Sequence, residues 1–302
     1  MTDIKHNDYY SSLKSIETEN YLDRWLYRPV GFCIAKALCG TCITPNMVTV
    51  FSIFVGAAVG PLFYFNNLKI NLLGIMFLVS ANILDCVDGQ LARLTGIKSK
   101  IGRILDGLAG DIWFTIIYVF LALRLKNEFG TYLFFIPAVI SGFSHLLQAN
   151  ITDYYKTVHL FFISTKNADD LPRYINICKQ YKEMRPGIEK CLFLVYKHYT
   201  CMQEKLTPEL QLMLDALEKK FGADIPDSIR NGFRLQSRRL MKQLIDLMTF
   251  NGRTIVLIIA VITDYIWAYF IYEIVVLNIV LMISIHKHEK ICKQITKISD
   301  EL

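Results

Sequence analysis

Four carboxylates lie between apolar runs that are long enough to cross a bilayer, and this arrangement constrains the fold most strongly. They are Asp85, Asp88, Asp106 and Asp111. A charge inside or at the edge of a membrane is costly unless a partner compensates it. On a helix, Asp85 and Asp88 share one face, and Asp106 lies early in the next apolar helix, after a short polar loop. Carboxylates on two such helices predict a site for a hard divalent cation, Mg²⁺ or Mn²⁺.

The apolar runs predict an all-α, polytopic membrane protein with six transmembrane helices. Each run has the length and apolarity of a bilayer crossing. Thr44 can cap a helix and Pro45 suits its first turn, so the first span should begin there. A turn near Tyr272 and Glu273 should separate the last two spans. The spans are expected at about residues 47–65, from 70 to just beyond Asp88, 101–123, 131–149, 254–270 and 271–285.

Composition divides the chain into four segments. The first is polar and then mixes apolar with basic residues, so it predicts an interfacial amphipathic helix anchored by Trp25. The second holds spans one to four with the carboxylates. The third has helical periodicity but no run long enough to span, which predicts a helical cytoplasmic insertion. The fourth holds spans five and six and a basic tail. The expected boundaries are 1–43, 44–151, 152–253 and 254–302.

The distribution of Lys and Arg predicts the orientation in the membrane. The turns on one side hold only Lys69, Arg124 and Lys126, and the other side holds many more basic residues. Because cytoplasmic loops are enriched in Lys and Arg, both termini, the carboxylates and the insertion should face the cytoplasm. The net charge of +6 suits contact with anionic lipid. A lipid bilayer is therefore an expected partner, and nucleic acid is not.

The carboxylates belong to a spaced motif in which small residues and one arginine also have fixed places. Glycine and alanine leave room where a large group approaches the backbone, and a guanidinium suits phosphate. The spacing resembles the CDP-alcohol phosphotransferase (CDP-alcohol phosphatidyltransferase) signature, D-x2-D-G-x2-A-R-x8-G-x3-D-x3-D. Thr44-Pro45-Asn46-x2-Thr49 at the start of span one is a weaker point of resemblance. The matching positions are Asp85, Asp88, Gly89, Ala92, Arg93, Gly102 and Asp106.

The resemblance implies that the protein cleaves the pyrophosphate of a CDP-linked alcohol, releases CMP and passes the phosphoryl unit to a second alcohol. It implies a metal site of Asp85, Asp88 and Asp106. Gly89, Ala92, Arg93 and Gly102 would contact the nucleotide and its phosphates. The basic residues Lys98, Lys100 and Arg103 would suit a phosphorylated acceptor such as glycerol phosphate or inositol phosphate, and they would equally suit anionic headgroups.

The last position departs from the family pattern, because Gly110 stands where the final Asp is expected and Asp111 follows it. In the family that Asp is assigned as the base. On a regular helix an Asp at 110 would lie about 40° from Asp106, whereas Asp111 lies about 140° away. A π-bulge near Gly107 and Gly110 could rotate Asp111 into the site as the catalytic base. Otherwise another residue is the base, or the protein binds nucleotide and metal yet transfers poorly.

These observations favour an enzyme that transfers a phosphatidyl-type group from a CDP-linked lipid to a polar alcohol. One alternative is an aminoalcohol-type transferase, which moves a CDP-linked head group onto a lipid alcohol. Another is a catalytically weak family member that binds a partner through its insertion. A cation transporter is less favoured, because ion passage does not need Gly89, Ala92 and Arg93. A homodimer is compatible with each of these alternatives.

Overall fold

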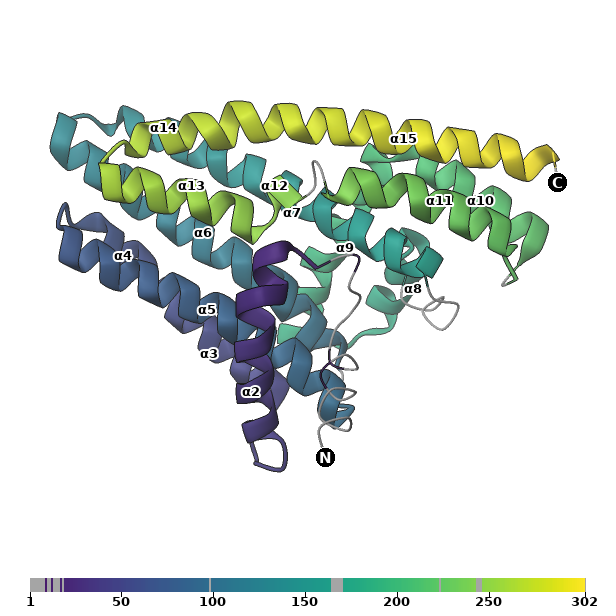
Figure 1. Cartoon of the computed structure of the whole chain (residues 1–302), viewed down its shortest axis with the longest axis horizontal. Helices are drawn as coiled ribbons and strands as arrows, with labels where there is room; N and C mark the ends of the chain where they lie inside the picture. The colour runs from purple at the N-terminus through teal and green to yellow at the C-terminus, as the bar shows by residue number, and fades with distance from the viewer. Residues whose placement is uncertain are drawn as a thin grey trace. The chain divides into compact units, whose positions relative to one another are not determined.

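The described part of the chain contains helices and no strand, so the expected all-α class is confirmed. The chain divides into two compact units, each described by itself below. The first unit comprises Met1–Leu146 and Phe250–Val276, and the second comprises Leu147–Thr249 and Leu277–Leu302. Figure 1 shows the order of the helices along the chain. This computed structural model describes residues 9, 12, 17, 19–97, 99–163, 171–222, 224–242 and 246–301.

Five helical stretches among the described residues are long and apolar enough to cross a membrane. The first four correspond to the expected spans one to four. The remaining apolar helix, α13 (Phe250–Thr263), has 14 residues and is shorter than these five. The described residues therefore confirm a multi-pass pattern, and the count of six spans stays a prediction. The five stretches are Pro45–Tyr64, Leu68–Thr95, Ile101–Phe129, Tyr132–Ile163 and Ile266–Ser299.

The expected turn near Tyr272 and Glu273 is wrong. The chain turns instead at Asp264, which has a left-handed backbone with a φ of 63°. The Asp264 carboxylate accepts a hydrogen bond of 2.7 Å from Asn66 Nδ2 and pairs with Arg124. From there the chain continues without a break in helicity, because the charge of Glu273 is compensated inside the protein. The helices are α14 (Ile266–Ile271), η5 (Tyr272–Val276) and α15 (Leu277–Glu301).

Polar caps and glycines set the ends of the long helices in the first unit. Asn67 accepts hydrogen bonds from the first backbone N–H groups of α5, and Ser99 does the same for α6. Gly96 and Gly130 follow α5 and α6 in left-handed conformations that glycine adopts freely. The loop between α5 and α6 is therefore short. The helices are α3 (Pro45–Ala57), α4 (Val59–Tyr64), α5 (Leu68–Thr95) and α6 (Lys100–Phe129).

Small residues let these helices pack closely. A Cβ atom added to Gly56 would lie 2.3 Å from Trp113 Cδ1, so glycine is required where α3 meets α6. Helices α13 and α14 complete the same apolar core. The core fixes α5 and α6, which carry the predicted metal ligands. Its largest buried members include Phe63, Phe114, Tyr118, Tyr269 and Phe270.

The N-terminal segment is helical from η1 (Asp23–Tyr27) through α2 (Arg28–Leu38), as expected. The side chain of Trp25 is 71% exposed, which suits an anchor at a membrane interface, although the interfacial position stays a prediction. Burial, together with the neighbouring Asp23 carboxylate, raises the pKa of the Tyr27 hydroxyl. The backbone carbonyl of Arg28 accepts a hydrogen bond of 3.1 Å from Gln90 Nε2, which ties α2 to α5.

Helix α7 (Phe135–Ile163) follows the short η2 (Tyr132–Phe134) and continues past the expected end of span four at residue 149. The boundary expected at residue 152 falls within α7, and the limits of the insertion stay a prediction. Its helices include α10 and α11, and α11 begins at Asp227. Helices α10 and α11 pack on α15 within the second unit. The insertion helices are α8 (Tyr174–Glu183), α9 (Ile188–Leu206), α10 (Pro208–Phe221), α11 (Asp227–Leu240) and α12 (Asp246–Met248).

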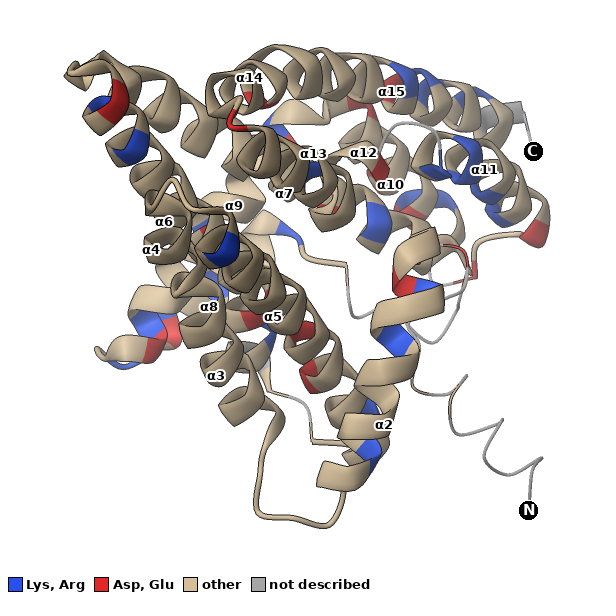
Figure 2. Ribbon diagram, turned by 60° about the vertical axis from the view of Figure 1, so that its left-hand side comes forward, with Lys and Arg blue, Asp and Glu red and all other residues tan. Residues whose placement is uncertain are grey.

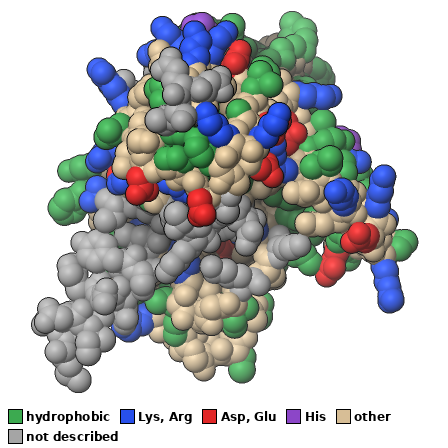
Figure 3. All heavy atoms as spheres, turned by 90° about the vertical axis from the view of Figure 1, so that its right-hand side faces the viewer, with side chains coloured by type: hydrophobic (Ala, Val, Ile, Leu, Met, Phe, Trp, Pro, Cys, Tyr) green, Lys and Arg blue, Asp and Glu red, His purple; other side chains and the backbone are tan. Residues whose placement is uncertain are grey.

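Basic residues gather on two helices of the second unit. Figure 2 shows Lys and Arg along α11 and along the C-terminal half of α15. Basic side chains also project from the face drawn in Figure 3. On α15 the exposed side changes from Ile279 and Met282 to lysines after His286. This change is consistent with a helix that passes from an apolar to a polar environment. The exposed basic residues are Arg238, Arg239, Lys242, Lys287, Lys290, Lys293 and Lys297.

Candidate active site

Asp85, Asp88 and Asp106 converge. The first two lie near the C-terminal end of α5 and the third lies near the start of α6. One oxygen from each carboxylate lies within 4.8 Å of one from each of the others. Asp88 is buried and the other two are half-buried, so the cluster is partly accessible. The structure therefore brings together the three carboxylates that the sequence predicts as metal ligands.

Thr49 on α3 orients the buried member of this cluster. Its Oγ1 lies 2.5 Å from Asp88 Oδ2, and the hydroxyl donates to the carboxylate. Both side chains are buried, with exposed fractions of 2% and 3%. The sequence indicated Thr49 only as part of the motif that begins span one. Its position one turn after Pro45 places it on the face of α3 that meets α5.

Asn46 in the same motif holds the loop between α5 and α6. Asn46 Nδ2 donates to Ser99 Oγ at 3.2 Å, and Ser99 Oγ accepts from the Gly102 backbone N–H at 2.8 Å. A Cβ atom at Gly102 would lie 2.3 Å from Asn46 Oδ1. The glycine of the signature is therefore needed here for the close approach of α3 to the first turn of α6.

Arg93, Gly89 and Ala92 lie on the last turns of α5. Arg93 Nε donates to the backbone carbonyl of Ser12. A Cβ atom at Gly89 would lie 3.3 Å from Arg93 Nη2, so glycine leaves room for the guanidinium. A phosphate that used Arg93 Nε would take the place of the Ser12 carbonyl. Contact of these three residues with nucleotide stays a prediction.

The basic residues predicted to meet the acceptor lie next to the cluster in sequence. Lys98 and the side chain of Lys100 lie outside the described residues. Arg103 is exposed on the first turn of α6. The Arg103 side chain is thus accessible, and its contact with an acceptor stays a prediction.

The carboxylate cluster fits a hard divalent cation. Its donors are carboxylate oxygens, which Mg²⁺ and Mn²⁺ prefer over nitrogen or sulfur. The Thr49 hydroxyl donates to one oxygen of Asp88. The three carboxylates come from two helices, and a cation bound by them could also take substrate oxygens as ligands. The donor set therefore supports the predicted metal, and its identity stays a prediction.

The π-bulge expected in α6 is wrong. Helix α6 is a regular α-helix across its full length, including Gly107 and Gly110. Asp111 is buried, and its Oδ1 lies 3.6 Å from His145 Nε2 on α7. The cost of burying this carboxylate, which motivated the bulge, is reduced by a partner on another helix. A Cβ atom at Gly110 would meet no atom within 4 Å, so the expected position of the last Asp is open space.

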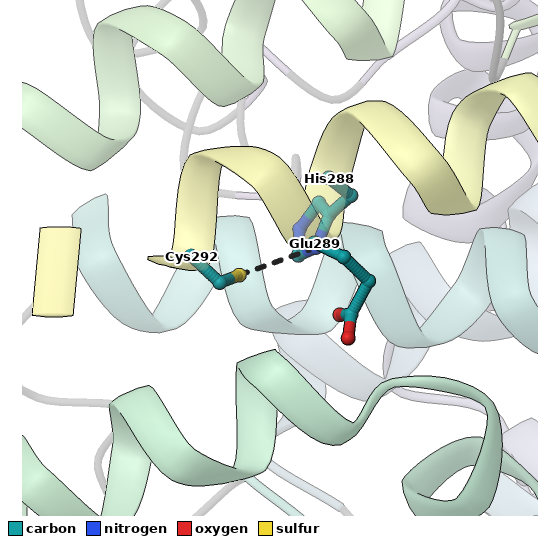
Figure 4. A group of neighbouring side chains, drawn as sticks. All are labelled: His288, Glu289 and Cys292. Atoms are coloured by element: carbon teal, nitrogen blue, oxygen red, sulfur yellow. Dashed lines mark hydrogen bonds between the residues drawn. The ribbon is translucent and has the colours of Figure 1, made fainter. Parts of the chain in front are cut away.

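A second group of possible metal ligands lies on α15, where His288, Glu289 and Cys292 approach within 4.8 Å. Cys292 Sγ lies 3.5 Å from His288 Nδ1, and Figure 4 shows the Glu289 carboxylate directed away from the sulfur. That carboxylate accepts hydrogen bonds from the backbone N–H groups of Glu209 and Leu210, at 2.6 and 3.4 Å. Glu289 therefore caps the start of α10, which is a structural role.

Comparison with known proteins agrees with the signature. Residues 42–164 match the CDP-alcohol phosphatidyltransferase family. The archaetidylinositol phosphate synthase of Pyrococcus horikoshii is 41% identical over 73 residues, which are 24% of this chain and 37% of the relative. The CDP-diacylglycerol–glycerol-3-phosphate 3-phosphatidyltransferase of Rickettsia typhi is 34% identical over 68 residues, 22% of this chain and 38% of the relative. The chain thus spans less than half the length of these relatives. Residues 42–164 therefore match the family model of a CDP-alcohol phosphatidyltransferase domain.

Proposed function

We propose that this protein is a metal-dependent enzyme of phospholipid synthesis. It transfers a phosphatidyl-type group from a CDP-linked lipid to a polar alcohol and releases CMP. The convergence of Asp85, Asp88 and Asp106 inside the matched domain carries this proposal. The name of one relative contains CDP-diacylglycerol and glycerol-3-phosphate, and that of another contains archaetidylinositol phosphate. Both names support a lipid donor and a phosphorylated polar acceptor.

In the proposed reaction, the acceptor hydroxyl oxygen attacks the phosphorus attached to the lipid. The bond from that phosphorus to the bridging oxygen breaks, CMP leaves with the electron pair, and a base takes the hydroxyl proton. Asp85, Asp88 and Asp106 would hold the cation, and Arg93 would contact a phosphate. When bound, Mg²⁺ or Mn²⁺ would supply positive charge to the pyrophosphate as its bond breaks. Gly89, Ala92 and Gly102 would leave room for the nucleotide.

The proposal assigns no residue as the base that takes the proton of the acceptor hydroxyl. The regular α6 removes the π-bulge that would carry Asp111 toward the metal ligands, so its role as the base stays a prediction. The second sequence-based alternative, another residue as the base, gains support from the contact between Asp111 and His145. We further propose that the site, both termini and the insertion face the cytoplasm, where water-soluble acceptors reach the carboxylates.

A second candidate function is that of a catalytically weak member that binds a partner. It is favoured by the contact of Asp111 with His145. It is also favoured by the helical insertion, of which residues 165–249 lie outside the matched domain. An aminoalcohol-type transferase would use the same carboxylates with a soluble CDP-alcohol. These alternatives make different predictions for CMP release.

The test is CMP release by purified protein in detergent micelles. CDP-diacylglycerol is supplied with glycerol 3-phosphate or inositol phosphate, with Mn²⁺ or with excess chelator. We expect release that needs both Mn²⁺ and an acceptor. Release from CDP-choline with diacylglycerol alone would favour the aminoalcohol branch. Absence of release from every pair would overturn the enzymatic proposal.

A further inference from the structure

Asp111 is one end of a chain of buried polar contacts in the first unit. Its Oδ1 lies 3.6 Å from His145 Nε2, and each of the two side chains is 7% exposed. The other imidazole nitrogen, Nδ1, lies 3.0 Å from Arg253 Nη1 and 3.1 Å from the Tyr118 hydroxyl. The imidazole therefore stands between a carboxylate and a guanidinium.

The guanidinium fixes the direction in which the imidazole donates. An arginine side chain has only donors, so the Nδ1 atom that faces Arg253 has to accept. A neutral imidazole that accepts at one nitrogen carries its proton on the other. The proton of His145 therefore lies on Nε2, which faces Asp111. The Nε2–H group of His145 faces the Asp111 carboxylate across 3.6 Å, a polar contact that is longer than a hydrogen bond.

Arg253 is itself held in place from the other side. Its Nη1 donates to Glu273 Oε2 at 2.7 Å, and the Tyr269 hydroxyl donates to Glu273 Oε1 at 2.9 Å. Arg253 and Glu273 are buried, with exposed fractions of 1% and 0%. A buried guanidinium beside a buried carboxylate has little freedom to leave. Both residues lie outside the matched domain at 42–164.

We propose that His145 is a positioning residue that holds Asp111 and thereby fixes the rotation of α6 at Asp106. This inference rests on the proposed function, because it takes Asp106 as a metal ligand. Asp111 follows Asp106 by five residues, so fixing one side chain on a regular helix also fixes the direction of the other. Gly107 and Gly110 contribute no side-chain contact in this turn. Asp111 thus serves as an anchor, and another group takes the acceptor proton.

The first test reads the imidazole directly. Nitrogen-15 magnetic resonance of full-length protein with labelled histidine, compared with His145→Gln, identifies the His145 signals. We expect a neutral ring protonated on Nε2. A neutral ring protonated on Nδ1, or a ring protonated on both nitrogens at neutral pH, would overturn the proposal.

The second test measures Mn²⁺ affinity by calorimetry, without turnover. His145→Ala should lower the Mn²⁺ affinity, because it releases Asp111 and with it the rotation of α6 at Asp106. His145→Gln keeps an N–H near the position of Nε2 and should restore most of the affinity. Gly142→Ala on the same helix is the matched control, because its Cβ meets no atom within 4 Å. If His145→Ala does not fold, the nitrogen-15 spectrum of the unaltered protein remains the test of the inference.

Asp106→Asn separates this inference from the proposed function. If Asp106→Asn leaves Mn²⁺ affinity unchanged, the proposed metal site is wrong. If Asp106→Asn weakens binding while His145→Ala and His145→Gln both bind like the unaltered protein, the metal site stands and the positioning role is wrong. A loss in His145→Ala with no rescue by His145→Gln would also contradict the role.

Discussion

The Thr49 hydroxyl donates to the buried Asp88 carboxylate at 2.5 Å, across 39 residues of sequence. The motif that begins α3 is thereby joined to the signature on α5. A donated hydrogen bond orients a carboxylate that would ligate a cation. Two patterns that resemble one family separately are therefore parts of one site.

Removing this hydroxyl should weaken the site. In Thr49→Val the shape is kept and the donor is lost, and a hydrogen bond to a charged group contributes about 1.5–3 kcal/mol. We expect lower Mn²⁺ affinity and lower CMP release. Thr49→Ser, which keeps the hydroxyl, is the control. Equal Mn²⁺ affinity in Thr49→Val and Thr49→Ser would contradict the orienting role.

Removing a ligand charge should abolish activity. Asp85→Asn or Asp106→Asn leaves the cation with fewer anionic oxygens, so binding and turnover should both fall. Calorimetry with Mn²⁺ or Mg²⁺ and the CMP assay measure these effects. Asp153→Asn changes an exposed carboxylate on α7 and should bind as the unaltered protein does. An unchanged affinity in either ligand variant would refute the metal assignment.

Restoring the family arrangement should be tolerated. Gly110→Asp places a carboxylate in open space, about 40° around α6 from Asp106. The additional charge should tighten Mn²⁺ binding while the melting temperature changes little. If Asp111 is only an anchor, Gly110→Asp should raise the rate, and Asp111→Asn should lower it less than Asp106→Asn does. A Gly110→Asp protein that fails to fold would show that the position is not open.

Filling the contact at Gly102 should be destabilising. In Gly102→Ala the new Cβ would lie 2.3 Å from Asn46 Oδ1, so the Asn46 amide has to move from its contact with Ser99 and stability should fall. Thermal unfolding of the two single variants and of the double variant with Asn46→Ala measures the effect. The double variant should regain part of the loss. Gly107→Ala, which meets no atom within 4 Å, is the control.

Labelling of single cysteines in a cysteine-free protein tests the orientation. A probe at Asn67 or Asn127 should react with an impermeant reagent added outside, and a probe at Lys205 should react only after the membrane is opened. The expectation follows from the excess of basic residues on the side that holds Lys205. The reverse pattern would overturn the proposed topology.

The carboxylate cluster could be predicted because its residues lie close together in the sequence. Asp85 and Asp88 share a helical face, and the short loop to α6 brings Asp106 to them. The sequence predicts a turn at Tyr272 and Glu273, whereas Glu273 lies inside a continuous helix. Its compensating Arg253 lies twenty residues earlier, on another helix. No local pattern shows that two such residues will meet.

Local patterns also do not show which residue on another helix lies next to Asp111. A carboxylate in the membrane needs a compensating partner, and the sequence favours the nearest carboxylate cluster as its place. The partner is His145, a single histidine in an apolar run, which sequence alone does not distinguish from a residue of the core. Helix α6 stays regular through Gly107 and Gly110.

The core of the first unit also bears on whether the matched domain can exist alone. The family likeness ends at residue 164, but Leu257, Val261 and Phe270 complete the core around α6. A fragment of residues 42–164 would keep all residues of the signature and would expose the apolar surface that α13 and α14 cover. It would also lack the guanidinium that sets the imidazole of His145. The limits of sequence likeness therefore do not coincide with the limits of autonomous folding.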